Sequence, residues 1–346
     1  MAICTAVVDL PVPPFSLAKT ILCGALVSDT GGVELFPGLL HCTKMGRGGE
    51  APPGGRLIGG VSRVQTVNRL DPLRSAIALL RKDGPVALVP TMGALHEGHL
   101  ALVREARKRA AHVVVSIFVN PRQFGAGEDL GTYPRQPAQD GELLKQEGVS
   151  LLWIPSVGEM YPAGCATHVT VDGVSQELCG RVRPGHFGGV ATVVCKLFNQ
   201  VQPDFALFGE KDWQQLTVIR RMARDLDLSL PAASAIIGVP TVREGDGLAL
   251  SSRNAYLSLE QRAQAAMLPA AMRGAVAAIK AGKDYADALA ALHEQLLGGG
   301  FNAVDYAEIR DGDTLALLPG PGPGTPRLFV AARIGGTRLI DNLAVG

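Results

Sequence analysis

The chain has 346 residues, of which 47% are hydrophobic and 19% charged, a composition typical of a globular protein with material for a sizeable core. Its formal net charge of +1 argues against a nucleic-acid partner, because proteins that bind nucleic acid usually carry a concentrated basic excess. No apolar run reaches the ~20 residues of a membrane span, and the six cysteines include no C-x-x-C pair. We therefore expect a cytoplasmic protein with reduced thiols and no membrane partner.

The first 60 residues differ in composition from the rest of the chain. They contain 11 Gly and 6 Pro. The run Arg47–Gly55 (RGGEAPPGG) disfavours helix and strand, because Gly costs backbone entropy and Pro lacks a donor. Phe15–Val27 is mildly apolar, but no basic segment precedes it as in a secretory signal. We predict that residues 1–60 form a poorly ordered extension, whose role the sequence does not indicate.

From residue 61 to residue 238, strand and helix patterns alternate. The expected strands are Val86–Met92, His112–Val119, Val149–Ile154, Phe205–Phe208 and Ala235–Val239. The expected helices are Leu73–Arg81, Leu100–Ala110, Gly141–Glu147, Gly189–Gln200 and Gln214–Asp225. The strands are apolar and rich in β-branched residues, as in a sheet that is buried on both faces. This alternation predicts an α/β domain with a Rossmann-like, doubly wound parallel sheet.

The remaining residues, 239–346, predict a smaller C-terminal α+β domain that follows a hinge near Gly238–Pro240. Two Ala-rich helices are expected at Leu259–Ala281 and Tyr285–Leu297. Three strands are expected at Val304–Ile309, Arg327–Arg333 and Thr337–Ala344. A small domain that closes on a larger one can shield a reactive intermediate from water, so we interpret this domain as a lid.

The segment Pro90–His99 (PTMGALHEGH) carries the strongest chemical signal. It joins a predicted strand to a predicted helix, and an open parallel sheet binds ligands beyond the carboxyl ends of its strands. Backbone N–H groups at a helix N-terminus suit phosphate, and Gly93 and Gly98 allow the backbone to approach a ligand closely. His96 and His99 are three residues apart, so both can reach one polyphosphate and stabilise charge as pyrophosphate leaves.

Two other interpretations of the histidine pair remain open at this stage. The rings could ligate zinc, although an H-x-x-H pair supplies too few ligands and no obvious third ligand lies nearby. They could also cap the helix and take no part in chemistry. The strand–turn–helix context favours nucleotide binding over both alternatives.

The same segment resembles the H-x-G-H signature of nucleotidyltransferases related to class I aminoacyl-tRNA synthetases. The full string PTMGALHEGH is similar to that of the pantothenate synthetase family in particular. Further matching strings occur between Val64 and the C-terminus in the expected order. They are Ser116–Gly125, Tyr133–Arg135, Arg183–Phe187, Phe208–Asp212, Gly238–Glu244 and Ser251–Asn254.

The resemblance implies a set of site residues. The implied catalytic residues are His96, His99 and Lys211. The implied ATP-binding residues are Met92, Gly93, His96, His99, Gly209, Lys211, Asp212, Val242, Ser251, Ser252 and Arg253. The implied residues for pantoate and β-alanine are Asn120, Gln123 and Gln215. Asp212 could contact ribose, orient Lys211 or help to hold Mg²⁺.

Elementary chemistry is compatible with these roles. Asn120 and Gln123 follow a buried strand, and amides bind the hydroxyl and carboxylate groups of a small hydroxy acid without adding charge. Lys211 can neutralise a phosphate as a point charge, and the Arg253 guanidinium is an apt donor to phosphate oxygens. The plain alternatives are a loop amide, a surface Lys211–Asp212 pair and an ordinary loop before a helix capped by Ser258.

The resemblance further implies an AMP-forming ligase that joins pantoate to β-alanine through a pantoyl adenylate, with Mg²⁺ accompanying ATP and no metal site of its own. It implies a homodimer. Two departures stand out: Leu250 replaces the common Met, and the family's acidic cluster is thinned to Ala138-Gln139-Asp140. The alternatives are another H-x-G-H nucleotidyltransferase and a non-catalytic nucleotide-binding protein of the same fold.

Overall fold

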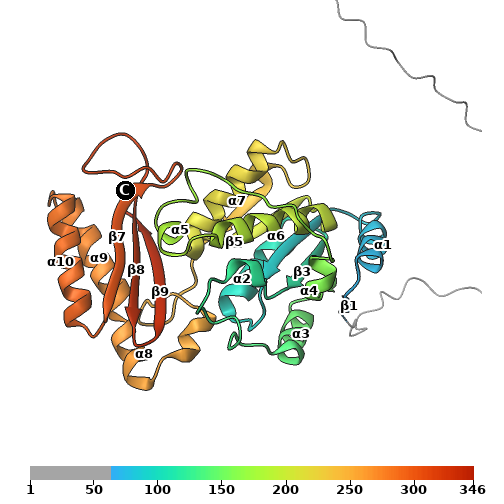
Figure 1. Ribbon diagram of the computed structural model, residues 1–346, viewed down its shortest axis with the longest axis horizontal. Helices are drawn as coiled ribbons and strands as arrows, with labels where there is room; N and C mark the ends of the chain where they lie inside the picture. Colours follow the sequence, from blue (N-terminus) through green and yellow to red (C-terminus); the bar gives the residue numbers. More distant parts are fainter. Residues whose placement is uncertain (1–63) are drawn as a thin grey trace, which may run out of the picture. The chain divides into compact units, whose positions relative to one another are not determined.

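The computed structural model describes residues 64–346, so the prediction of a poorly ordered extension over residues 1–60 lies outside the described part of the chain. Two sheets organise the described residues (Figure 1). The helices are α1 (Leu70–Leu80), α2 (Glu97–Arg107), α3 (Pro137–Gln146), α4 (Val157–Met160), α5 (Cys179–Val182), α6 (His186–Val201), α7 (Trp213–Asp225), α8 (Leu259–Ala265), α9 (Met267–Lys280) and α10 (Tyr285–Gly298). Short 3₁₀ turns are η1 (Pro121–Gln123), η2 (Glu210–Asp212), η3 (Ala233–Ala235) and η4 (Ser252–Tyr256).

The larger sheet has six parallel strands in the order β1-β4-β3-β2-β5-β6. They are β1 (Gln65–Val67), β2 (Val86–Thr91), β3 (His112–Ile117), β4 (Leu151–Trp153), β5 (Phe205–Gly209) and β6 (Ile236–Val239). Strand β2 is central, because Val86 pairs with His112 of β3 and Ala87 pairs with Phe205 of β5. Strands β3 and β4 extend the sheet on one side of β2, and the later strands β5 and β6 extend it on the other. This reversal of strand order places a topological switch point at β2.

Apolar helices cover both faces of this sheet. Side chains of α1, α6 and α7 pack on one face in a cluster that includes Trp153 and Phe198. Side chains of α2 and α3 pack on the other face against Val89, Val115 and Leu207. The strands are therefore buried on both sides, which explains their continuous apolar runs. The predicted α/β, doubly wound parallel sheet is confirmed.

The smaller sheet is antiparallel and has the order β7-β8-β9, with β7 (Ala303–Asp311), β8 (Pro326–Ile334) and β9 (Thr337–Ala344). Helices α9 and α10 lie along one side of it (Figure 1) and share a second apolar core with its strands. This separate α+β region agrees with the predicted elements. The exact domain boundary near residue 238 stays a prediction.

The prediction of one helix over Leu259–Ala281 is wrong, because the chain forms α8 and α9 with a break at Ala266. Pro269 explains the break: it has no N–H to donate to the carbonyl of Ala265, and its ring crowds that carbonyl. Helix α8 starts at a capping box in which Ser258 Oγ accepts from Gln261 N and Gln261 Oε1 accepts from Ser258 N.

The last strand is tied to the turn that follows β5. Asn342 of β9 is 5% exposed and donates through Nδ2 to the carbonyls of Glu210 and Lys211, at 2.9 and 3.0 Å. Arg327 of β8 lies over the Trp213 ring at 3.4 Å. The smaller sheet thus holds the backbone of η2 in place, and η2 carries Lys211.

Candidate active site

A cavity of about 240 Å³ opens at the carboxyl edge of the larger sheet. Its lining comes from the segments that follow β2, β3, β5 and β6, and from helices α2 and α6. This edge is where open parallel sheets bind ligands. A second cavity, of about 470 Å³, adjoins it, shares lining residues that include Lys211 and Arg253, and extends to β9.

Nearly all the predicted site residues meet in the first cavity. Those that line it are Met92, His96, His99, Asn120, Gln123, Gly209, Lys211, Asp212, Gln215, Val242, Ser251, Ser252 and Arg253. Gly93 is not among the lining residues. It has φ +81°, and a Cβ there would lie 3.0 Å from Asp140 Oδ2. Gly93 therefore shapes the turn, and the ligand contacts of the other residues stay predictions.

Asp140 supports this turn through two hydrogen bonds to its backbone. It is 1% exposed, and its two carboxylate oxygens accept from Ala94 N at 3.0 Å and Leu95 N at 2.9 Å. Ala94 has a φ of +50°, which is unusual for a residue with a Cβ and needs such support. Asp140 sits in the first turn of α3, where the helix dipole favours a negative charge. Asp140, the acid that remains of the thinned cluster, thus shapes the turn that carries His96 and His99, which we call the histidine turn.

The two histidines cap α2, so the capping interpretation holds for one nitrogen of each ring. Nδ1 of His96 accepts from Gly98 N at 3.2 Å, and Nδ1 of His99 accepts from His96 N at 3.3 Å. The ring centroids are 4.1 Å apart. Because each Nδ1 is an acceptor, the proton of each neutral ring is assigned to Nε2.

Both rings are neutral at pH 7. Burial, helped by the Lys211 ammonium, lowers the pKa of His96 to about 4. Burial and the neighbouring His96 ring lower the pKa of His99 to about 3. Each ring can therefore offer one neutral N–H donor to a ligand in the cavity while its other nitrogen keeps the helix capped.

The amides that follow β3 have different bonding states. Asn120 is 1% exposed: its Nδ2 donates to Gly189 O and Gln123 Oε1, and its Oδ1 accepts from Tyr161 Oη and Arg122 N. Its hydrogen-bonding capacity is therefore used within the protein. Gln123 Nε2 points to Met92 Sδ, a weak acceptor, at 3.1 Å. Gln123 is thus the amide of the two that a ligand can engage.

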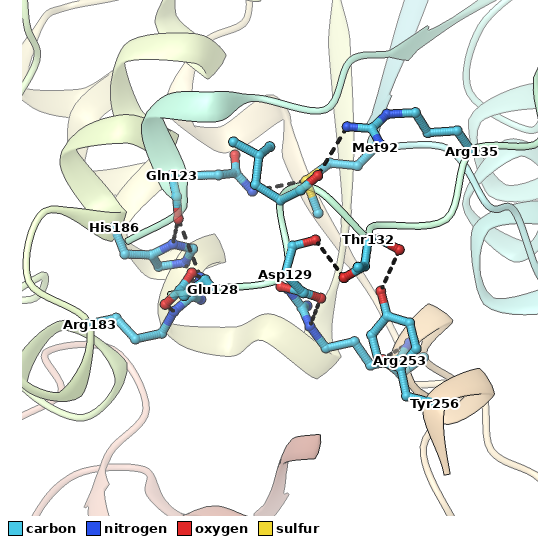
Figure 2. A network of polar contacts seen from close by, with 12 residues as sticks. Met92, Gln123, Glu128, Asp129, Thr132, Arg135, Arg183, His186, Arg253 and Tyr256 are labelled. Carbon is cyan, nitrogen blue, oxygen red and sulfur yellow. Dashed lines mark hydrogen bonds and ion pairs between the residues drawn. The ribbon is translucent and has the colours of Figure 1, made fainter. Parts of the chain in front are cut away.

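The backbone of Gln123 is clamped by His186 of α6 and by Arg183, which follows α5. Its carbonyl accepts from His186 Nδ1 at 2.8 Å and from Arg183 Nη2 at 3.3 Å, and Glu128 holds Arg183 with bonds of 2.7 and 2.5 Å (Figure 2). Burial and the Arg183 charge lower the pKa of His186 to about 4. Helix α6 crosses η1 at Gly189, where a Cβ would lie 2.1 Å from Arg122 O.

The segment before α8 is bonded to the histidine turn and to the loop that follows η1. Ser252 Oγ donates to Ala94 O at 3.2 Å, and Leu250 N donates to Val242 O at 3.0 Å. Arg253 forms a bidentate ion pair with Asp129, at 3.0 and 2.9 Å (Figure 2). Lys211 Nζ lies 3.9 Å from Asp212 Oδ2.

Five polar residues around the cavity had no role in the sequence interpretation: Glu128, Asp129, Asp140, Arg183 and His186. Arg183 and His186 belong to a matching string, so the string itself could have identified them. Asp140 was visible only as the last acid of a thinned cluster. The partners of Glu128 and Asp129 are too distant in sequence for any local pattern to reveal.

Among residues 64–346, no group of three or more His, Cys, Asp and Glu side chains could hold a metal ion. The zinc interpretation of the histidine pair therefore finds no third ligand in the described part of the chain. Within the same residues, no helix combines the length and the apolar character needed to cross a membrane.

Fold and cavity define a class, the Rossmann-like α/β proteins that bind ligands at the carboxyl edge of a parallel sheet. The chain belongs to the pantoate–β-alanine ligase family, whose profile, described as "Pantoate-beta-alanine ligase", matches residues 65–344. It is therefore an enzyme, a ligase that forms an amide bond. This argues against both the non-catalytic alternative and a nucleotidyltransferase that forms no amide.

Similar proteins carry the corresponding names. The pantothenate synthetase of Novosphingobium aromaticivorans is 64% identical over 284 residues, which are 82% of this chain and 99% of that protein. The pantothenate synthetase of Sphingopyxis alaskensis is 57% identical over 287 residues, 82% of this chain and 100% of its own.

Solved structures agree in fold. The pantothenate synthetase of Thermus thermophilus has a TM-score of 0.76 and 49% identity, and the match covers 82% of this chain and 99% of that one. The pantoate-β-alanine ligase of Francisella tularensis, complexed with beta-gamma ATP and β-alanine, has a TM-score of 0.69 and 32% identity, with 82% and 98% covered.

Proposed function

We propose that this chain joins pantoate to β-alanine at the expense of ATP, in two steps at the described cavity. One observation carries the proposal: neutral N–H donors of His96 and His99 line the same cavity as the Lys211 ammonium and the amides of Gln123 and Gln215. Phosphate-directed donors thus lie beside groups that suit a small hydroxy acid. The Francisella tularensis relative, whose structure holds beta-gamma ATP and β-alanine, supports the same combination of ligands.

In the first step a carboxylate oxygen of pantoate attacks the α-phosphorus of ATP. The new bond joins that oxygen to phosphorus, and the bond between the α-phosphorus and the bridging oxygen breaks to release pyrophosphate. A carboxylate is ionised at pH 7, so this step needs no strong base. His96, His99 and Lys211 stabilise the charge that develops on the phosphates, which is the dominant contribution expected in such transfers.

In the second step the amine of β-alanine attacks the acyl carbon of pantoyl adenylate. The amide C–N bond forms, the bond between the acyl carbon and the phosphate oxygen breaks so that AMP leaves with that oxygen, and the proton of the nitrogen passes to water. Until then the adenylate must be kept from water, a task that suits the segments around the cavity mouth.

The hydrogen bonds within the protein assign different roles to the three amides predicted to bind substrate. Gln123 and Gln215 line the cavity and bind substrate. Asn120 is saturated by protein partners, so it holds Gln123 through Oε1 and has no spare group for a ligand. ATP occupies the positions next to Met92, Gly209, Val242, Ser251, Ser252 and Arg253, and Mg²⁺ enters with ATP as part of the substrate, beside Asp212. A homodimer and a cytoplasmic location complete the proposal, and light scattering in solution tests the first.

The decisive experiment separates the two steps in time. ATP and pantoate are mixed with enzyme in stoichiometric amounts, and pyrophosphate and AMP are measured before and after β-alanine is added. The proposal expects pyrophosphate at once, about one per active site, and AMP with pantothenate only after β-alanine. A requirement for β-alanine before any pyrophosphate appears contradicts the adenylate scheme.

A further inference from the structure

Two adjacent carboxylates, those of Glu128 and Asp129, lie on one segment that lines the adjoining cavity. We call the segment Gly125–Thr132 the strap; it lies between η1 and Tyr133 and lines the adjoining cavity. Figure 2 shows that its two carboxylates point to different arginines. Glu128 binds Arg183, which clamps Gln123, whereas Asp129 binds Arg253 on the other side.

The pair between Asp129 and Arg253 uses only one edge of the guanidinium. Asp129 Oδ2 accepts from Nε at 3.0 Å and Oδ1 accepts from Nη2 at 2.9 Å. In the part of the chain that the structure describes, no hydrogen bond is found for Nη1. The guanidinium also lies 5.7 Å from the centre of the Tyr133 ring. The side-on pair therefore fixes the plane of Arg253 and leaves its outer edge available to an anion.

Three hydrogen bonds hold the backbone of the strap, and they help to keep Asp129 in place beside Arg253. Thr132 Oγ1 donates to Asp129 O, and Tyr256 Oη donates to Thr132 O, both at 3.4 Å. Arg135 Nη2 donates to Leu130 O at 3.1 Å. Side chains of Arg253 and Asp129 are 29% and 23% exposed, so water screens this pair less than it screens a pair on the open surface.

We propose that Asp129 is a positioning residue which, by holding Arg253 side-on, aims the free edge of that guanidinium at the β- and γ-phosphates of ATP. The proposal rests on the proposed function and deepens it. A free arginine has many rotamers, and ordering it on binding weakens affinity, so a partner that orders it beforehand strengthens binding. A carboxylate also repels phosphate and competes with it for the guanidinium, and this second effect changes ATP affinity in the opposite direction.

Calorimetric titration of the full-length protein with ATP, and separately with AMP, tests the proposal. Asp129→Asn should weaken ATP binding about threefold to tenfold, the range expected when one side chain must be ordered on binding. AMP binding should not change, because AMP lacks the phosphates that Arg253 meets. A general loss of structure would instead weaken both nucleotides.

Two further variants show whether Asp129 acts through Arg253. In an Arg253→Gln background, adding Asp129→Asn should have no further effect on ATP affinity. Glu128→Gln removes the same charge from the neighbouring position and should raise the KM for pantoate while leaving ATP affinity within about twofold. Unchanged or tighter ATP binding by Asp129→Asn overturns the proposal. A wild-type protein that binds no ATP instead refutes the proposed function.

Discussion

Nδ1 of His99 caps helix α2, whereas the proposed function assigns its Nε2 to a phosphate, and a pair of substitutions can separate the two roles. His99→Ala removes both the cap on His96 N and the Nε2 donor, whereas the short amide of His99→Asn can keep the cap. Both variants should lose about 10²–10⁴-fold in the rate of pyrophosphate release. Only His99→Ala should also lose about 1 kcal/mol of stability, measured by denaturant unfolding. A fully active His99→Asn enzyme would contradict the role of Nε2.

The lowered histidine pKa values predict how stability depends on pH. His96, His99 and His186 are neutral in the folded protein down to about pH 4, whereas in the unfolded chain each takes up a proton near pH 6.5. The unfolded state thus binds more protons, and the free energy of unfolding falls as pH drops from about 6.5 toward 4. Each ring contributes at most about 1.4 kcal/mol per pH unit, and less in practice because all three side chains are partly exposed to water.

Urea unfolding between pH 7.5 and 5 measures this dependence above the range where carboxylates titrate. His186→Asn should flatten the slope relative to wild type. A wild-type stability that is constant over this range, or that rises on acidification, would show that the rings are not held neutral by burial.

The sequence could predict which residues gather at one cavity, because they occur in short strings at the ends of predicted strands, while their ligand contacts stay predictions. Sequence did not reveal how they are bonded. Asn120 seemed equivalent to Gln123, but partners from α6 and from Tyr161 saturate it. Asp140 bonds to a turn far back in the chain, so its role depends on tertiary structure that no local pattern encodes.

At the scale of elements, the close contact between α6 and η1 predicts the effect of a substitution at Gly189 on stability and on pantoate binding. Gly189→Ala would place a Cβ 2.1 Å from the backbone oxygen of Arg122, which has no side-chain freedom to yield. Helix α6 and η1 must then separate, and Gln123 must move with η1. We expect a lower melting temperature and a higher KM for pantoate, with the KM for ATP changed less.

The neighbouring glycine provides a matched control. A Cβ at Gly188 meets nothing nearer than Val169 O at 4.0 Å, and the position is helical. Gly188→Ala should therefore be neutral or raise stability by about 0.5–1 kcal/mol, since Ala loses less backbone entropy in a helix. If both variants behaved alike, close packing at Gly189 would not be the cause.

Element types were predicted more reliably than element ends. Helix α2 starts at Glu97, before the predicted Leu100, because the histidine caps replace the usual Ser or Asp signal. The break between α8 and α9 was missed because the apolar pattern continues through it, although Pro269 in the sequence indicated an interruption. Strand β1 has three residues, too few for a periodic pattern to be recognised.

At the scale of the whole molecule, the family match and the chemistry both lie beyond residue 64. We predict that a chain beginning near Gly60 folds, binds ATP and makes pantothenate at a rate close to that of the full chain. Melting temperature and activity of the two chains are the measurements. If Val33–Cys42 (VELFPGLLHC) packs on the body, truncation should lower the melting temperature by several degrees, since ~1 kcal/mol corresponds to about 2–4 °C for this size. Insolubility or clear loss of activity would contradict dispensability.

The central position of β2 has a consequence for how the enzyme is made. One edge of β2 pairs with β3, which follows it closely in the sequence, as Val86 pairs with His112. The other edge pairs with β5 at Phe205, which is synthesised much later. The histidine turn follows β2, whereas Lys211 follows β5, so the two halves of the cavity meet only when this long loop closes. Closing a long loop slows folding. On the ribosome, the histidine turn should therefore emerge early and stay catalytically silent until the second half of the sheet has been synthesised and docked.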